Sequence, residues 1–261
     1  MRISYILVVF VILFNQLLFA SFENITISPN TIASGNISGF QIGDTSIPYL
    51  NTEKTYISLN YLYPYGLAEI SREDVSIQAK ILGTNSFFRV VNFGNSTYRE
   101  NTLQFSTAIF KLKDLTISPG LSLFYLHTEF DNTFSAGLDI TAFYKIFDNF
   151  EGLCSIKNLY AYETEKIDIP LEMFLNLHYS PIDVFDVYLG VEKDDRYKAN
   201  IKTGFSYLPI EFISLSMGYN FEPKNLNTGF TINFLNYKFS YALSYHFDLE
   251  YSHAIGIMYE I

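Results

Sequence analysis

The end of the chain alternates between large apolar and small polar side chains almost without a break. Leu235, Tyr237 and Phe239 begin one parity, whereas Asn236 and Lys238 begin the other. A period of two places one set on an apolar face and the other on a polar face of a β-strand. Each half of the pattern reaches the ~9–11 residues that a tilted strand needs to cross a bilayer. The alternation therefore predicts a pair of membrane-spanning β-strands.

The same pattern recurs towards the N-terminus, with turn residues between the runs. It predicts an all-β fold: a single transmembrane antiparallel β-barrel of about 14 strands. An even strand count places both ends of the barrel on the periplasmic side, where connections are short. The expected strands cover residues 54–64, 73–83, 85–94, 98–112, 115–129, 133–146, 151–161, 168–180, 183–193, 196–208, 210–221, 225–234, 235–247 and 249–261.

Composition favours a lipid-embedded barrel over a soluble sandwich, which is the alternative with a similar strand count. The chain is 49% hydrophobic and 18% aromatic, and only 17% of its residues are charged, against ~25% in soluble domains. Sandwich strands usually have ~5–6 residues, about half the length expected here. Tyrosines near the strand ends suggest an interfacial girdle, although the β-propensity of tyrosine alone also explains them.

Two N-terminal segments differ from the barrel pattern. Residues 1–20 have a basic residue, Arg2, and an apolar stretch from Ile6 to Phe14, as in a secretory signal peptide; an uncleaved anchor is the alternative. Residues 21–53 are rich in Ser, Asn, Thr and Gly and lack sustained alternation. They are expected to form a plug inside the barrel or a segment at its periplasmic mouth, or else a partly ordered tail. The barrel itself is expected over 54–261.

Charge and motif content exclude several functions. The net charge of −10 argues against nucleic-acid binding, which needs a basic footprint. Cys154 is the single cysteine, and no histidine belongs to a metal-binding motif. Ser244, His246 and Asp248 share a parity, but neighbours on one strand face lie ~7 Å apart, too far for a direct relay. We therefore predict no catalytic residues, no metal, no cofactor and no enzymatic activity.

The inward parity of the strands predicts the residues that line the lumen. Four phenylalanines on this parity would give part of the interior an apolar lining that suits a hydrophobic solute; alternatively, they pack against the N-terminal segment. The polar members are lysines and asparagines. The predicted lumen-lining residues are Phe88, Phe124, Phe143, Phe174, Lys198, Lys202, Asn227, Asn233 and Lys238.

Three short stretches resemble a known group of proteins. They are I-P-Y-L-N at 47–51, P-Y-G-L-A-E-I-S at 64–71 and L-E-Y-S-H-A-I-G-I-M-Y-E-I at 249–261. This order resembles the PorV/PorQ-type outer-membrane proteins, which are similar to the FadL-type fatty-acid transporters. Members of this group often have a leucine–glycine–x–x–histidine pattern near the C-terminus. Here His253 matches the histidine, whereas Glu250 replaces the glycine. The resemblance implies a fourteen-stranded barrel with a plug, and either transport of hydrophobic solutes or service to a secretion machinery.

The sequence thus predicts a bacterial outer-membrane channel or transporter for small or hydrophobic solutes. The alternative is a PorV-like structural or assembly component of an envelope complex; a rim enzyme and a soluble secreted protein are further alternatives. Expected partners are outer-membrane lipid, the barrel-assembly machinery, and a hydrophobic ligand or an envelope protein, but no nucleic acid. The expected assembly signal is the apolar set of the final strand: Ile255, Ile257, Tyr259 and Ile261.

Overall fold

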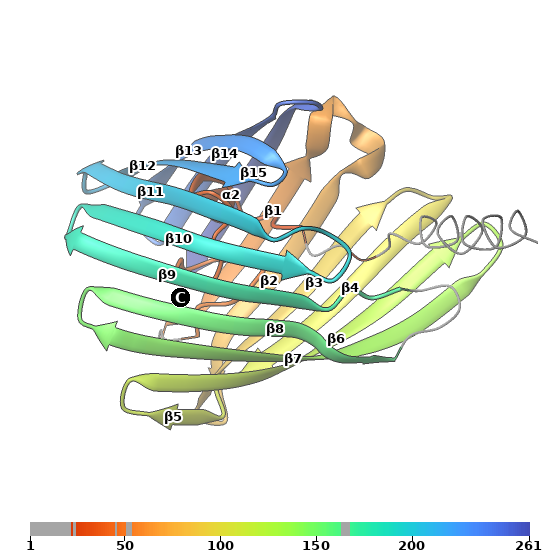
Figure 1. The fold of residues 1–261 in the computed structure, drawn as a ribbon, viewed down its shortest axis with the longest axis horizontal. Helices are drawn as coiled ribbons and strands as arrows, with labels where there is room; N and C mark the ends of the chain where they lie inside the picture. Colours follow the sequence, from red (N-terminus) through yellow and green to blue (C-terminus); the bar gives the residue numbers. More distant parts are fainter. Residues whose placement is uncertain (1–21, 23–24, 45, 51–53, 163–167) are drawn as a thin grey trace, which may run out of the picture.

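The chain folds into a closed barrel of long antiparallel strands (Figure 1). The computed structural model describes residues 22, 25–44, 46–50, 54–162 and 168–261. Strand β1 pairs with β2 and with the last strand, β15, so the ring closes. The segments β4 and β5 both pair with β6 and act as one interrupted strand. The described part of the chain therefore forms the predicted 14-stranded all-β barrel. The predicted signal peptide, 1–20, lies outside the described residues.

The observed strands follow the predicted ones closely, including the seventh, 151–161. Their bounds are β1 Tyr56–Tyr63, β2 Arg72–Ile81, β3 Thr84–Gly94, β4 Tyr98–Thr107, β5 Phe110–Leu112, β6 Leu115–Thr128, β7 Asn132–Phe147, β8 Phe150–Tyr162, β9 Glu172–Ile182, β10 Phe185–Asp194, β11 Asn200–Ile210, β12 Ile213–Phe221, β13 Lys224–Phe234, β14 Tyr237–His246 and β15 Glu250–Glu260. The largest shifts are at β9 and β11, which begin four residues later than expected. Proline at 170 and the loop 195–199 precede them, and a proline lacks the N–H of a strand interior.

The two ends of the barrel differ in their connections. At one end, here the short-turn end, two-residue turns join the strands at 82–83, 113–114, 148–149, 183–184, 211–212 and 235–236. Leu82 and Gly83 both have positive φ, of 51° and 86°, as in the tight turns that match strand twist. The other end, here the loop end, carries longer connections such as 64–71, with the 3₁₀ turns η1 Pro64–Gly66 and η2 Ala68–Ile70. This asymmetry agrees with the sequence expectation.

The outer face of the barrel is apolar and the inner face is mostly polar. Large exposed side chains point outward on every side, for example Val75, Leu103, Leu175, Ile201 and Ile255. A surface this apolar suits lipid and would aggregate in water. Among the described residues, no helix is long and apolar enough to cross a membrane.

The described N-terminal residues lie inside the barrel, where they form a plug, defined here as 25–44 and 46–50 (Figure 1). Its short helix α2, Pro29–Ala33, contacts β12 to β15. Ile27 and Ile32 are buried against the inner wall. Farther along, Ile37 and Phe40 enter a second apolar cluster with wall residues. The chain's own segment therefore occupies part of the lumen.

Candidate functional site

A row of glycines on four adjacent strands receives the plug. A Cβ atom on Gly204 would lie 2.0 Å from the carbonyl oxygen of Ser34, and one on Gly218 would lie 2.2 Å from the amide nitrogen of Gly35. Gly35 itself has a φ of +89°, which favours glycine. Only hydrogen atoms fit in this contact. The glycine row consists of Gly190, Gly204, Gly218 and Gly229. All four glycines fall on the inward parity of their strands, and this is the signal by which the sequence marks them.

Polar side chains of the wall hold the plug backbone beside the glycine row. Lys202 Nζ donates to the carbonyl oxygen of Asn36 at 3.1 Å. Asn176 Nδ2 donates to Ser38 O at 2.9 Å. These bonds satisfy plug carbonyls that would otherwise be buried without a partner.

Three of the four predicted lumen phenylalanines contact the N-terminal segment. The rings of Phe124 and Phe22 lie 5.0 Å apart, and those of Phe143 and Tyr49 lie 5.4 Å apart. Phe174 is buried in the cluster that contains Ile37 and Phe40. Their apolar surface is thus occupied by the chain itself, as the alternative interpretation expected.

The prediction for the fourth, Phe88, is wrong. Its side chain is 44% exposed on the outer face, opposite Ile77 and Phe105 in the register. Its neighbour Arg89 is inside, because its guanidinium bonds the buried Asp74. The need of this charge for a partner fixes the parity of β3, which the apolar pattern alone left open.

The wall of β1 to β8 carries a continuous row of hydrogen bonds, here the polar belt. Arg89 donates to Asp74 at 2.9 Å and to Gln104 at 3.2 Å. Ser122 donates to Asp139 at 2.8 Å, and Asp139 accepts the backbone N–H of Asn158 at 2.8 Å. The members in strand order are Asn60, Asp74, Arg89, Gln104, Ser122, Asp139 and Asn158.

Small cavities lie between this belt and the plug. Two of about 30 Å³ each share Gln104 and Lys157 in their lining, and each has room for about one or two waters. In the register, Lys157 lies opposite Glu172, which faces the larger cavity at the loop end. The two small cavities therefore lie beside the polar belt rather than beside the glycine row.

One carboxyl group of the plug is fully enclosed. Asp44 accepts backbone hydrogen bonds from Gly39 at 2.6 Å and from Ser46 at 2.9 Å. Burial raises the pKa of Asp44 from 3.8 to about 6, although these hydrogen bonds and the charge of Arg89 act in the opposite direction. Desolvation thus outweighs the favourable contacts.

A cavity of about 670 Å³, here the vestibule, opens above the plug at the loop end. Its floor includes the plug residues Ile25, Thr26 and Asn36. Lys202 lines it from β11, on the inner face. Lys198 also lines it, but from the exposed loop 195–199 rather than from the barrel wall, because β11 begins only at Asn200.

The remaining predicted residues lie at separate places. Asn227 is fully buried inside, and its side-chain amide has no hydrogen-bond partner among the residues that the structure describes. Asn233 and Lys238 are half-buried and face each other in the register beside the turn 235–236, at the short-turn end. Of the predicted assembly residues, Ile255, Ile257 and Tyr259 are on the outer face of β15, and Ile261 directly follows the strand. Their role stays a prediction.

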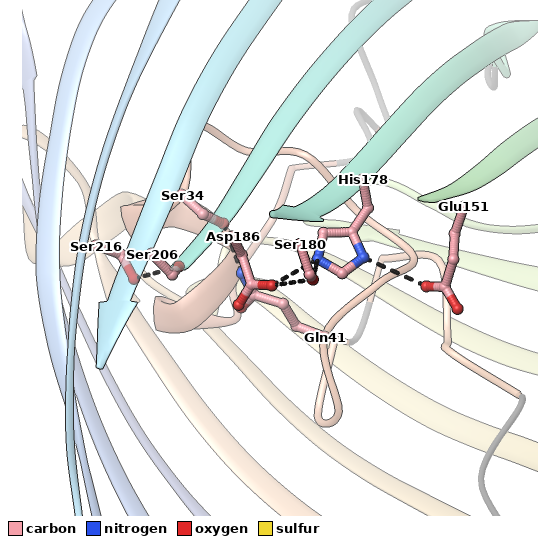
Figure 2. Close-up of polar contacts among 8 residues, drawn as sticks. All are labelled: Ser34, Gln41, Glu151, His178, Ser180, Asp186, Ser206 and Ser216. Atoms are coloured by element: carbon pink, nitrogen blue, oxygen red, sulfur yellow. Dashed lines mark hydrogen bonds and ion pairs between the residues drawn. The ribbon is translucent and has the colours of Figure 1, made fainter. Parts of the chain in front are cut away.

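A charged cluster that we did not predict lies at the short-turn end (Figure 2). Asp186 Oδ1 lies 2.9 Å from His178 Nε2, and Glu151 Oε2 lies 3.3 Å from Nδ1. Ser180 Oγ lies 3.2 Å from the same Nε2 but donates to Asp186 at 2.5 Å. The imidazole faces a carboxylate on both sides, so it is poorly placed to take a proton from Ser180. These groups come together because β9 pairs with β8 on one side and with β10 on the other.

This cluster contacts the plug. The His178 ring stacks on Tyr188 at 5.0 Å and lies 5.4 Å from the ring of Phe40. Gln41 Nε2 of the plug donates to Ser34 Oγ at 2.8 Å close to this cluster (Figure 2).

At the opposite end of the barrel, His246 Nδ1 accepts the backbone N–H groups of Asp248 and Leu249. That nitrogen is thus engaged by the turn rather than by the Asp248 carboxylate.

Comparison with known proteins identifies the fold. No protein-family model and no curated protein matches the chain. Among solved structures, the Pseudomonas putida toluene transporter TodX aligns at a TM-score of 0.63 and 11% identity, covering 88% of this chain and 96% of TodX. The deltaS2 mutant of the TodX monoaromatic hydrocarbon channel aligns at 0.64 and 9%, covering 92% and 99%. The likeness to TodX shows the fold. The resemblance to PorV/PorQ-type and FadL-type proteins stays a prediction.

Proposed function

We propose that this protein is an outer-membrane channel or transporter for small solutes that is closed by its own plug. One observation carries the proposal: a vestibule open at the loop end leads to a plug that rests on glycines inside a closed barrel. The apolar outer face suits a barrel embedded in lipid and supports a location in the outer membrane. TodX, named as a toluene transporter, has the same fold and supports the transport class.

The inner phenylalanines give little support to a hydrophobic solute for this chain. Their rings contact Phe22, Phe40 and Tyr49 rather than an open cavity. The cavity that opens above the plug is the vestibule, and its lining is rich in charged and amide side chains. We therefore favour small polar solutes, which pass when the plug moves.

A reversible crosslink tests whether the plug is the gate. Thr231 Oγ1 on β13 donates to Asn30 Oδ1 on the plug at 2.5 Å, so the two side chains meet, and a disulfide between cysteines at these positions would tie the plug to the wall. We expect the N30C/T231C protein, with Cys154 replaced by Ser, to lose conductance in planar bilayers when oxidised and to recover it on reduction. Each single-cysteine variant is the control. Equal conductance in both redox states would refute the gate.

A second candidate is the assembly component implied by the PorV-like resemblance. Its support is an aromatic surface at the loop end of β6 to β8, where Phe130 is 94% exposed in the turn 129–131 and Phe134 and Tyr160 point outward nearby. Such a patch suits either the lipid interface or an envelope protein. A partner that co-purifies in detergent and is lost on Phe130→Ser would favour this function; a barrel that conducts alone would favour the first. In both cases we propose lipid and the barrel-assembly machinery as partners.

A further inference from the structure

The vestibule has the volume and chemistry of a binding site. Its volume of about 670 Å³ falls within the ~300–1,000 Å³ of small-molecule sites. Three walls enclose it: the loop 64–71, the loop 195–199 and the turn 222–223, above the plug. A solute that enters the barrel from the loop end therefore meets this space first.

Four of the seven charged side chains that line the vestibule form two ion pairs. Lys202 forms an ion pair with Glu192 and also bonds the plug carbonyl of Asn36. Arg196 contacts both carboxylate oxygens of Asp194, at 3.1 and 3.3 Å. An ionic solute would have to compete with these internal partners. The matched charges instead present fixed donors and acceptors with little net charge.

Side-chain amides on two neighbouring strands add unused hydrogen-bonding capacity. Asn225 lines the vestibule, and its Oδ1 is buried without a partner among the described residues. Asn220 lies between Lys202 and Asn225 on the inner face and is 3% exposed. Its Oδ1 likewise has no partner in the part of the chain that the structure describes. A buried amide oxygen of this kind costs free energy until a donor reaches it. Of the two, Asn225 lines the vestibule, and a turn of its side chain would bring the amide to a hydroxyl group of a solute.

Two tyrosines enter the vestibule from different loops. Tyr65 has a positive φ of 51°, and its backbone N–H donates to Ser252 Oγ at 3.1 Å, which fixes the loop against β15. Tyr197 is in the opposing loop, and the guanidinium of Arg196 lies 5.5 Å from its ring centroid. Aromatic rings combine an apolar face with a polar tip and so pack against the C–H face of a sugar ring.

We propose that the vestibule is a binding site for neutral oligosaccharides. The proposal rests on the proposed transport function and names its substrate class. Amides and matched ion pairs would bond the hydroxyl groups, while Tyr65 and Tyr197 would contact the ring faces. An apolar hydrocarbon would leave these polar groups without partners, and an anionic sugar would meet carboxylates already held by Lys202 and Arg196.

Titration calorimetry on the full-length barrel in detergent tests the site. The probes are maltotriose, cellotriose and xylotriose as neutral sugars, trigalacturonate as the anionic sugar and toluene as the apolar solute. We expect saturable binding of at least one neutral trisaccharide, at least tenfold tighter than trigalacturonate or toluene. Absence of binding across the neutral probes, or equal or tighter binding of either of the other two, would overturn the proposal.

Variants assign the binding to the vestibule. We expect Tyr197→Ala and Asn225→Ala each to weaken the trisaccharide at least tenfold. The matched controls Tyr207→Ala and Thr228→Ala change exposed residues on β11 and β13 and should bind as wild type; gel mobility before and after heating verifies folding. Unchanged binding in both vestibule variants would overturn the site. Binding without redox-gated conductance would defeat only the proposed gate, whereas gated conductance without sugar binding would defeat only the site.

Discussion

The two halves of the inner wall hold the plug by different means. On β10 to β13 the glycine row lets the plug backbone approach so closely that a single Cβ atom would clash at Gly204 or Gly218. On β1 to β8 the wall carries the polar belt, whose members bond mainly to one another. The cavities of about 30 Å³ lie on the belt side.

This difference separates two tasks. Close contact on the glycine row depends on shape and allows one plug arrangement. The belt satisfies its own buried charges whether or not the plug is present, so it can face water when the plug moves. We expect the glycine row to determine where the plug rests, and the belt to determine how stable the barrel is with a wet lumen.

The largest effect is expected from breaking the belt at Arg89. Its side chain is 2% exposed and that of Asp74 is 0% exposed, so Arg89→Met leaves a buried carboxylate without its cation. We expect a loss of about 3–5 kcal/mol in unfolding free energy, measured by denaturant titration in detergent. The double variant Asp74→Asn/Arg89→Met should recover much of it, because Asn60 can still donate to the amide oxygen. Wild-type stability of the single variant would show that the pair contributes little.

A change in the glycine row should act mainly on the plug. In Gly218→Ala the new Cβ would meet the backbone of Gly35 at 2.2–2.3 Å, so we expect docking to weaken by about 1–3 kcal/mol. Protease cleavage within 25–44 should accelerate and conductance should rise, while the barrel remains folded. Gly152→Ala, where the nearest atom would be at 3.5 Å, is the control. A plug equally protected in both variants would contradict the role of the row.

Period-two alternation was enough to predict the barrel from sequence. It placed the strands and the short turns, because one face of each strand meets lipid and the other meets the lumen. It failed at Phe88, where apolar residues occupy both parities and the charge of Arg89 decides the face. It also assigned Lys198 to a strand, whereas this residue lies in the loop 195–199 and lines the vestibule from there.

The candidate site was less predictable than the fold. Phe124, Phe143 and Phe174 point inward as expected, but the sequence left their partners open. Whether they line a cavity or pack against the plug depends on contacts between residues more than 80 positions apart. The His178 cluster likewise requires the pairing of β8, β9 and β10. The alternation within one strand does not show which residues of other strands or of the plug its side chains will contact.

A smaller, pH-dependent effect is expected from Asp44, which joins the two halves because Arg89 of the belt influences this plug carboxyl. Its pKa is about 6 in the docked plug and near 3.8 when released. An acid whose pKa is raised by docking favours the docked state most below pH ~4, and this contribution is lost as the pH rises to about 6. We expect plug cleavage by protease to increase over this window in wild type. Asp44→Asn, which mimics the neutral acid, should remove that increment; an identical pH profile would contradict the assignment.

The smallest effect is expected from an ion pair outside both halves. Lys54 and Glu260 pair where β1 meets β15, and the Lys54 side chain is 61% exposed. The carboxylate of Glu260 raises the pKa of Lys54, yet solvent screens an exposed pair and holding two side chains together costs entropy. We expect Lys54→Ala to leave the unfolding midpoint unchanged in the titration that reports the loss in Arg89→Met. A comparable loss of unfolding free energy in both variants would mean that an exposed ion pair stabilises the barrel as much as the buried pair of the polar belt.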